Sequence, residues 1–306
     1  MADKLRGLSQ VLDSTNDLLN TVQNYEQDVD SKEDSIEDFL KGRDPSELSR
    51  QELDQLEEML GEEGQEIEGE VERMEKAINN QQQVIEYLNK YEQAVGSEEQ
   101  RTFKKLEKVK GEIRGLNQKM SHQTVDKAIG DLENAVAEMS QEADQILGAA
   151  KVLAEMEQTE GSEFQLESHL EEEVKRFDTE VNKVEQLVNY VGGEQESEYA
   201  SKIEEMRQQI DEEVKTENRQ IRQEIQEEEE LVEQIKQEAQ RYQKELEEAY
   251  EEAQSVEQRI QGSQGFQNEE NELGKIINQL EKEKEEADKA IQMIQQDESF
   301  LSRLMS

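Results

Sequence analysis

The amino-acid sequence predicts an all-α protein, an elongated antiparallel coiled coil or helical bundle of about six helices. Apolar residues make up 32% of the 306-residue chain and aromatic residues 4%. This is too few for a thick globular core but enough for a narrow seam between helices. One proline is present, and the abundant Glu, Gln, Lys and Leu all favour helix. The apolar residues recur at alternating spacings of three and four, the period of one helix face.

The net charge of -43 arises from 78 acidic and 35 basic residues. High charge with low hydrophobicity is also typical of disordered chains. The regular apolar spacing argues against disorder, because a disordered chain has no reason to keep it. The acid excess fits either a Glu-rich helix surface or adaptation to a salt-rich, halophilic cytoplasm, in which carboxylates keep a protein hydrated.

Turn-forming residues divide the pattern into segments. In an N-terminal region, 1–160, helices are expected at about 3–40, 45–95, 97–120 and 124–159, the last two forming one segment whose frame slips at 121–124. In a C-terminal region, 162–306, they are expected at about 163–191, 197–261 and 267–304.

The first two segments show the pattern most clearly. Leu5 to Leu40 keep the 3,4 spacing, and Asp44-Pro45-Ser46-Glu47 then reads as the start of a new helix, with a cap, a first-turn proline and an acid at the third position. Leu53 to Val95 hold one heptad frame. Glu63, Gln81 and Glu92 fall in this frame, so we expect them at polar core positions.

Glycine and serine mark the expected ends of the later segments, at 96–97, 161–162, 192–193 and 262–265. The stretch after the first of these carries an apolar stripe of Phe103, Leu106, Val109, Ile113, Leu116 and Met120. The final segment is expected to keep Leu273, Ile277, Leu280 and Lys284 in one frame. Segments 163–191 and 267–304 together match 197–261 in length, so both can fold back antiparallel along that helix. The pattern equally allows a self-associating rod, in which helices pair between chains.

Residues that usually carry catalysis are sparse. The chain has no cysteine and two histidines, His122 and His169, neither of which has a second histidine one turn away to share a metal. Residues 28–34 faintly resemble a calcium loop, but Lys32 replaces a ligand and Glu33 stands where the sharp turn needs glycine. We therefore expect no enzyme activity, no cofactor and no metal site.

A basic stretch departs from the acidic background. Between residues 101 and 120 the chain has seven basic and two acidic residues, and the basic ones are Arg101, Lys104, Lys105, Lys108, Lys110, Arg114 and Lys119. The first four share one helix face. Such a basic amphipathic helix pairs with carboxylates of its own chain or of a second copy, or docks an anionic partner such as a membrane surface.

The C-terminal residues Phe300, Leu301, Leu304 and Met305 crowd one side of a final helical turn. Two roles are open for them: packing on the end of the bundle, or serving as a docking tail for a partner.

These observations favour a non-catalytic structural or scaffold coiled-coil protein that mediates protein–protein interaction or self-assembly. The alternatives are an acidic binding module for basic partners, acting as a chaperone or nucleic-acid mimic, and a membrane-surface protein that uses the 101–120 stretch. Expected partners are another protein or a second copy, with a basic protein or an anionic membrane surface as alternatives. Nucleic acid ranks lowest, and no small-molecule substrate is expected. The N-terminus leads into an amphipathic segment and no apolar run is long enough for a membrane span, so we expect a cytoplasmic location.

Overall fold

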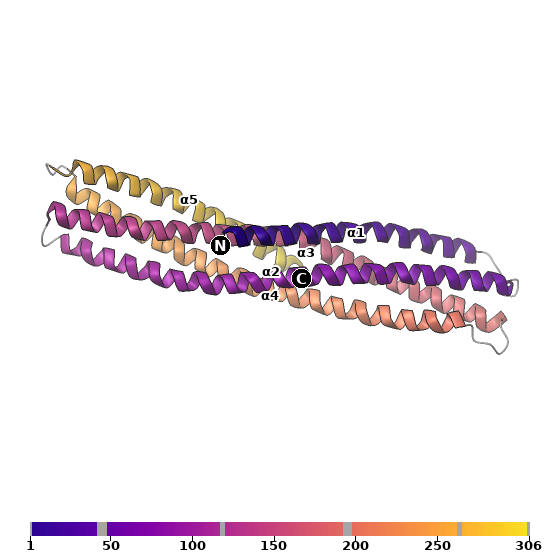
Figure 1. The fold of residues 1–306 in the computed structure, drawn as a ribbon. Coiled ribbons are helices and arrows are strands. Elements are labelled where there is room, and N and C mark those ends of the chain that lie inside the picture. The colour runs from indigo at the N-terminus through magenta and orange to yellow at the C-terminus, as the bar shows by residue number, and fades with distance from the viewer. Residues whose placement is uncertain (1, 42–47, 117–119, 192–197, 262–264, 305–306) are drawn as a thin grey trace. The chain divides into compact units, whose positions relative to one another are not determined.

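A computed structural model describes residues 2–41, 48–116, 120–191, 198–261 and 265–304. These residues form five α-helices and no strand: α1 Ala2–Leu40, α2 Arg50–Leu116, α3 His122–Val191, α4 Glu198–Ile260 and α5 Gln267–Leu304 (Figure 1). The predicted class, an all-α helical bundle, is confirmed. The start signal expected at Asp44–Glu47 lies outside the described residues. In its place, Ser49 and Glu52 form a capping box, in which the Ser49 amide donates to Glu52 Oε2 at 2.8 Å.

Contacts between the helices divide the chain into two compact units. Unit 1 comprises Met1–Ser9, Val84–Glu157 and Glu227–Ser306; unit 2 comprises Gln10–Gln83 and Gln158–Gln226. Helices α2, α3 and α4 each contribute to both units, so neither unit is a single stretch of sequence. The units therefore do not coincide with the two consecutive regions, 1–160 and 162–306, expected from the sequence.

Two expected helix ends are wrong. Helix α2 is continuous through Gly96 and Ser97, and α3 is continuous through Gly161 and Ser162. An interior glycine costs a helix only about 1 kcal/mol, which packing outweighs where the buried seam continues. In α3 it does continue, because Met156, Thr159, Glu163 and Leu166 are all buried on either side of the glycine.

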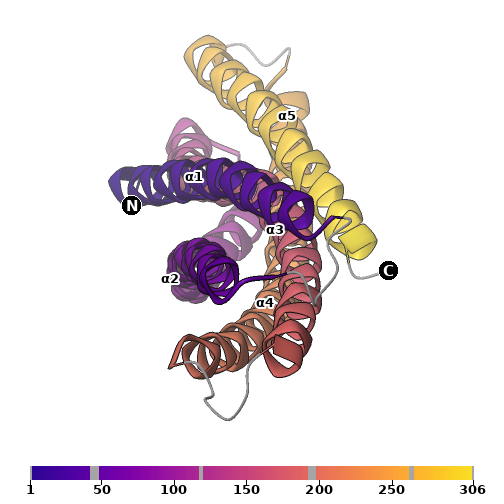
Figure 2. The same ribbon diagram turned by 90° about the vertical axis from the view of Figure 1, so that its right-hand side faces the viewer.

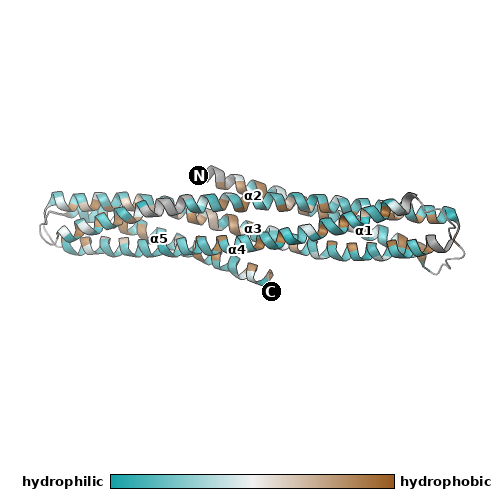
Figure 3. Ribbon diagram, turned by 90° about the horizontal axis from the view of Figure 1, so that it is seen from below, coloured by the Kyte–Doolittle hydropathy of each residue, from teal (hydrophilic) through white to brown (hydrophobic). Residues whose placement is uncertain are grey.

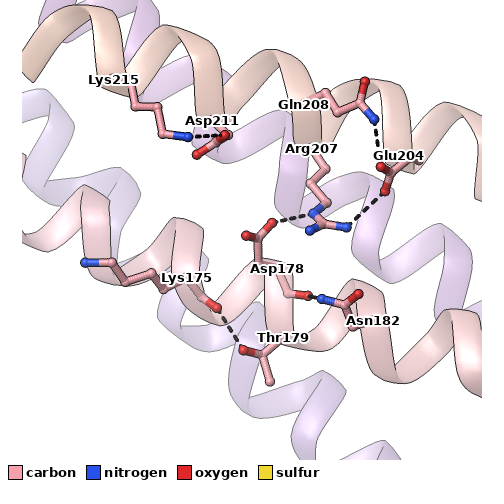
Figure 4. Close-up of polar contacts among 9 residues, drawn as sticks. All are labelled: Lys175, Asp178, Thr179, Asn182, Glu204, Arg207, Gln208, Asp211 and Lys215. Carbon is pink, nitrogen blue, oxygen red and sulfur yellow. Dashed lines mark hydrogen bonds and ion pairs between the residues drawn. The ribbon is translucent and has the colours of Figure 1, made fainter.

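Unit 2 contains segments of α1, α2, α3 and α4, which Figure 2 views roughly along their length. Neighbouring helices are antiparallel, because residue numbers rise on one helix as they fall on its partner. Lys32 of α1 contacts Glu62 of α2, and Tyr25 contacts Arg73. Between α3 and α4, Arg207 Nε donates to Asp178 Oδ1 at 2.6 Å (Figure 4), and Asn218 donates to Glu171.

Unit 1 contains segments of α2 to α5 together with the first residues of α1. Its α2–α3 and α4–α5 pairs are also antiparallel. Lys236 of α4 pairs with Glu298 of α5 at 2.6 Å, and further along the same helices Tyr250 donates to Glu281 at 3.0 Å. Helix α4 is thus paired with α3 in unit 2 and with α5 in unit 1, which is the fold-back arrangement expected from the segment lengths.

The core follows the heptad pattern. Apolar residues recur along the helices among a majority of hydrophilic ones (Figure 3). Of the three polar core positions predicted in α2, two are buried, with Glu63 1% and Gln81 0% exposed, whereas Glu92 is only half-buried. In unit 2 the apolar cluster includes Leu60, Phe177 and Ile210, which come from three different helices.

Two parts of the expected pattern are wrong. Phe103 is 48% exposed and Thr102 is buried in its place, because the frame leading to Leu106 and Val109 counts back to position 102. Met120, expected at the end of the same stripe, is 42% exposed and lies just before α3.

In α5, the frame also differs from the expected one. Ile276 and Glu283 are buried, whereas Ile277 and Lys284 are only half-buried. Neighbouring isoleucines at 276 and 277 fit either frame. In the observed frame Glu283 faces α3, where the Ser140 hydroxyl donates to it at 2.6 Å. Lys284 lies at the boundary, where its Nζ is 3.7 Å from Glu247 and 5.3 Å from the centre of the Tyr250 ring.

Candidate functional site

The basic stretch lies on α2 in unit 1, and part of it pairs with the acidic residues of neighbouring helices. Lys105 forms an ion pair with Glu138 of α3, and Lys108 Nζ lies 2.9 Å from Asp131 Oδ2. The hydrogen bond to Asp131 raises the pKa of Lys108. These lysines help to hold α2 and α3 together.

Lys110 faces α4 in the same unit. Its Nζ lies 2.5 Å from Glu248 Oε2 and 3.0 Å from Glu107 Oε1. Burial acts to lower the pKa of Lys110, but the hydrogen bonds with the two carboxylates outweigh it, and the pKa is raised. Lys110 therefore connects α2 to α4 as a charged residue at neutral pH.

The other basic residues that the structure describes in this stretch are exposed. No ion pair joins Arg101, Lys104 or Arg114 to a described residue, although Arg101 lines a small pocket with Glu138 and Glu142 of α3. Phe103 is also exposed, at the edge of this surface opposite Arg101, and Lys119 lies outside the described residues. We call the surface formed by Arg101, Phe103, Lys104 and Arg114 the cationic face.

Two glycines flatten the cationic face. Gly111 and Gly115 are exposed, and a Cβ atom added at either would meet nothing within 4 Å. Helical spacing places Gly111 two turns after Lys104, near the middle of the face. A partner could therefore approach the α2 backbone closely here.

Unit 2 contains an open groove of about 710 Å³ between α2 and α4. Its lining is dominated by carboxylates from both helices, and we call it the acidic groove. The lining residues are Glu68, Val71, Glu72 and Glu75 of α2, and Gln208, Gln209, Glu212, Glu213, Thr216, Glu217 and Gln220 of α4.

Like charges face each other across the acidic groove. Burial, and then the Glu213 and Glu72 carboxylates, raise the pKa of Glu68. Burial raises the pKa of Glu217 to about 8, assisted by Glu75 and Glu213. No Lys or Arg is among the lining residues. A cationic group entering the groove would relieve this repulsion.

The C-terminal residues divide between core and surface. Leu301 is buried in unit 1, whereas Phe300 and Leu304 are half-buried and Met305 lies outside the described residues. The Phe300 ring centre is 5.9 Å from the guanidinium carbon of Arg303. Leu301 therefore contributes to packing, and the remaining exposed area is small.

His122 connects the starts of two helices in unit 1. Its ring stacks on Phe266 with a centroid distance of 4.3 Å, and Nδ1 lies 2.7 Å from Glu269 Oε1. The hydrogen bond with His122 is the largest cause of the lowered pKa of Glu269. This is a structural contact between the first residues of α3 and α5.

Sequence reasoning missed most of the buried acids. Glu163, Glu217 and Glu228 are buried although nothing marked them in the sequence analysis. The available signal was the frame itself: Ile210, Val214, Glu217 and Ile221 continue one 4,3 spacing. The core of this protein therefore contains more polar positions than the sequence analysis predicted.

Comparisons with known proteins found two designed structures of low overall similarity. No protein-family model and no curated protein matches the chain. A computationally designed three-helix bundle is 19% identical with a TM-score of 0.22, and the match covers 78% of this chain and 99% of that one. A structure described as computational design of self-assembling cyclic protein homooligomers is 13% identical with a TM-score of 0.19, covering 97% and 98%. Separately, none of the described helices has an apolar stretch long enough to cross a membrane.

Proposed function

We propose that the protein is a non-catalytic scaffold that self-assembles, with the cationic face of one copy packing into the acidic groove of another. The observation that carries this proposal is the presence of two complementary surfaces on one chain. The face offers Arg101, Lys104 and Arg114 without ion-pair partners among the described residues, and the groove offers opposed carboxylates without a basic residue.

The exposed Phe103 side chain strengthens this assignment. An exposed aromatic residue next to Lys104 combines apolar area with charge, the mixture that is enriched at protein interfaces. Val71 supplies an apolar side chain within the acidic groove. Contact would thus bury apolar surface in addition to pairing charges.

The net charge sets the conditions for association. Two chains of charge -43 repel each other at long range, but screening confines this repulsion to about 8 Å at physiological ionic strength. Close contacts between opposite charges then decide the outcome. At about 1 M salt these contacts are screened as well, so association should be strongest at intermediate salt.

The proposed contact is heterologous, joining different surfaces on the two copies, so it continues from copy to copy. This gives a decisive mixing experiment. Lys104→Glu/Arg114→Glu removes the face, and Glu72→Lys/Glu212→Lys removes the groove. Each variant alone should remain monomeric in light scattering, because its face and its groove then carry charges of the same sign. Their mixture should associate, because the intact face of one variant meets the intact groove of the other and the two reversed surfaces are complementary as well.

Matched control variants carry the same charge changes elsewhere. Lys275→Glu/Lys289→Glu and Glu58→Lys/Glu133→Lys alter exposed residues outside both surfaces, and should assemble like the wild type. A wild-type chain that stays monomeric at every salt concentration would refute self-assembly. If that monomer captured a Lys- and Arg-rich helical peptide in the acidic groove, the function would instead be binding of basic partners.

A further inference from the structure

A second acidic cluster in unit 2 lies away from the acidic groove, among α1, α2 and α3. Glu33 and Glu37 belong to α1 and Glu180 belongs to α3, and one carboxylate oxygen from each lies within 4.8 Å of the others. Glu37 is exposed, Glu33 is half-buried and Glu180 is buried, so the cluster extends from the surface into the unit.

Glu63 of α2 forms the inner end of this cluster. Its side chain is 1% exposed, and its Oε2 atom is buried without a hydrogen-bond partner. Burial, followed by the carboxylates of Glu180 and Glu33, raises the pKa of Glu63 to about 9. A side-chain hydrogen bond with Glu180 also contributes to this shift, yet Oε2 itself remains buried without a donor, which is costly unless a proton or a cation compensates it.

The nearby basic residues compensate the cluster only in part. Arg176 Nη1 lies 3.0 Å from Glu33 Oε2 and 3.6 Å from Asp30 Oδ1, at the outer side. Burial raises the pKa of Glu180 to about 7, although the positive charge of Lys183 acts to lower it. No basic residue is among the groups that shift the pKa of Glu63, so the inner end of the cluster keeps its excess of carboxylates.

We propose that Glu33, Glu37, Glu63 and Glu180 bind a divalent cation of the Mg²⁺ and Mn²⁺ class. These ions take carboxylate oxygens and complete their shell with water. Helical bundles can build such sites from inward-facing carboxylates on different helices. The exposed Glu37 carboxylate provides an entry from solvent, and the buried Glu63 oxygen provides a ligand that no protein group uses.

A neighbouring group could draw softer ions. Asp30, His169 and Glu173 also bring one ligand atom each within 4.8 Å of the others, and His169 Nε2 lies 3.3 Å from Glu173 Oε1. Imidazole suits Zn²⁺ better than Mg²⁺. The all-carboxylate group is assigned here because Glu63 faces it with an unsatisfied oxygen.

Mn²⁺ is the probe for the experiment, because electron paramagnetic resonance distinguishes free from bound ion. We expect the full-length chain to bind one Mn²⁺ more tightly than its exposed acids do. Glu63→Gln/Glu180→Gln should weaken this binding more than about tenfold. Glu163→Gln removes an equally buried charge in the same unit, outside the cluster, and should leave binding within about twofold.

Thermal unfolding shows that a loss of binding is not a loss of folding. Without metal, Glu63→Gln/Glu180→Gln should be at least as stable as the wild type, because it removes carboxylate repulsion. Added Mn²⁺ should raise the Tm of the wild type and of Glu163→Gln, but not that of the double variant. An equal rise in all three proteins would overturn the site.

Zn²⁺ tests the neighbouring group. Binding of Zn²⁺ in preference to Mn²⁺, abolished by His169→Gln, would also overturn the assignment, since the ion would then occupy the Asp30–His169–Glu173 group. Self-assembly is tested with variants of the cationic face and the acidic groove, which share no residue with this cluster. Failure of the metal site and failure of the proposed function are therefore distinguishable.

Discussion

Unit 1 and unit 2 share three helices and the same heptad packing, but they handle charge in opposite ways. In unit 1, lysines connect neighbouring helices through carboxylates, as in the Lys110–Glu248 and Lys236–Glu298 pairs. Unit 2 has surface pairs such as Arg207–Asp178 (Figure 4). However, it also buries carboxylates whose pKa values are raised, among them Glu163 and Glu217.

The comparison shows that one fold can use acidic residues in two ways. An acid paired with lysine at a helix boundary contributes modestly at neutral pH. An acid buried in the seam without a cation favours the folded state only when protonated or when an external cation is supplied. Unit 2 should therefore respond to pH and cations more strongly than unit 1.

The largest expected effect is a loss of stability as the pH rises. Burial raises the pKa of Glu163 and Glu217 to about 8, whereas both ionise near 4.5 in the unfolded chain. Their contribution is fully present below pH 4.5 and is lost as the pH rises through about 8. Urea unfolding should show a decrease on the order of a few kcal/mol between pH 5 and 9.

The groups that act on these two acids define the control. Glu75, Glu213 and Glu163 all act on Glu217, and Gln81 acts to lower the pKa of Glu163. Glu163→Gln/Glu217→Gln should flatten the pH profile. Asp297→Asn, which removes a buried acid of unit 1 with a pKa raised to about 7, should flatten it less. A free energy of unfolding that increases with pH would contradict the account of unit 2.

A second expectation is that replacing Glu by Gln changes the free energy of unfolding in opposite directions in the two units. At pH 8, Glu163→Gln should stabilise the protein by about 1–3 kcal/mol, because it removes a buried charge. Glu248→Gln breaks the ion pair with Lys110 and should destabilise by about 0.2–1 kcal/mol. Urea unfolding at pH 5 and 8 checks both, and equal signs at pH 8 would remove the distinction.

A smaller effect is expected at the buried tyrosine of unit 1. Tyr242 is 0% exposed and its hydroxyl donates to the Met139 carbonyl at 2.8 Å. Burial raises the pKa of Tyr242, so it stays neutral throughout. Tyr242→Phe should cost about 0.5–1.5 kcal/mol, equally at pH 5 and 9. A pH-dependent cost would show that an acid beside Tyr242 titrates in this range.

The smallest effect concerns two helical glycines. A Cβ atom at Gly130 in unit 1 meets nothing within 4 Å, so Gly130→Ala should stabilise by about 0.5–1 kcal/mol. A Cβ atom at Gly64 in unit 2 would overlap Met206 and lie 3.1 Å from Phe177 Cζ. Gly64→Ala should therefore lack this gain in stability. A higher Tm for Gly64→Ala than for Gly130→Ala would contradict tight packing around Gly64.

The sequence predicts the fold class and most buried positions, because a heptad frame is local information. Glu63 and Gln81 were placed correctly for that reason. The continuity of α2 at Gly96 and of α3 at Gly161 was missed, because a glycine signals an end only when packing does not carry the helix through. Local spacing predicted the basic face, but the division of its lysines between paired and unpaired depends on which helices lie beside α2.

The carboxylate cluster is the feature least accessible from sequence. Glu33, Glu63 and Glu180 are separated by many residues, and only the packing of three helices brings them together. In sequence, residues 28–34 faintly resemble a calcium loop. Asp30 and Glu33 of that stretch lie in helix α1, where they join acids of α3 instead of forming a loop.

The sharing of α2, α3 and α4 between units bears on how the protein unfolds. If one unit melted alone, each shared helix would end at 83–84, 157–158 or 226–227, inside continuous helix. Every new end would leave up to four backbone groups without partners and no capping residue selected for that position. Partial unfolding thus creates costs that complete unfolding avoids. We expect the chain to unfold as one cooperative system in which weakening of either unit is felt by both.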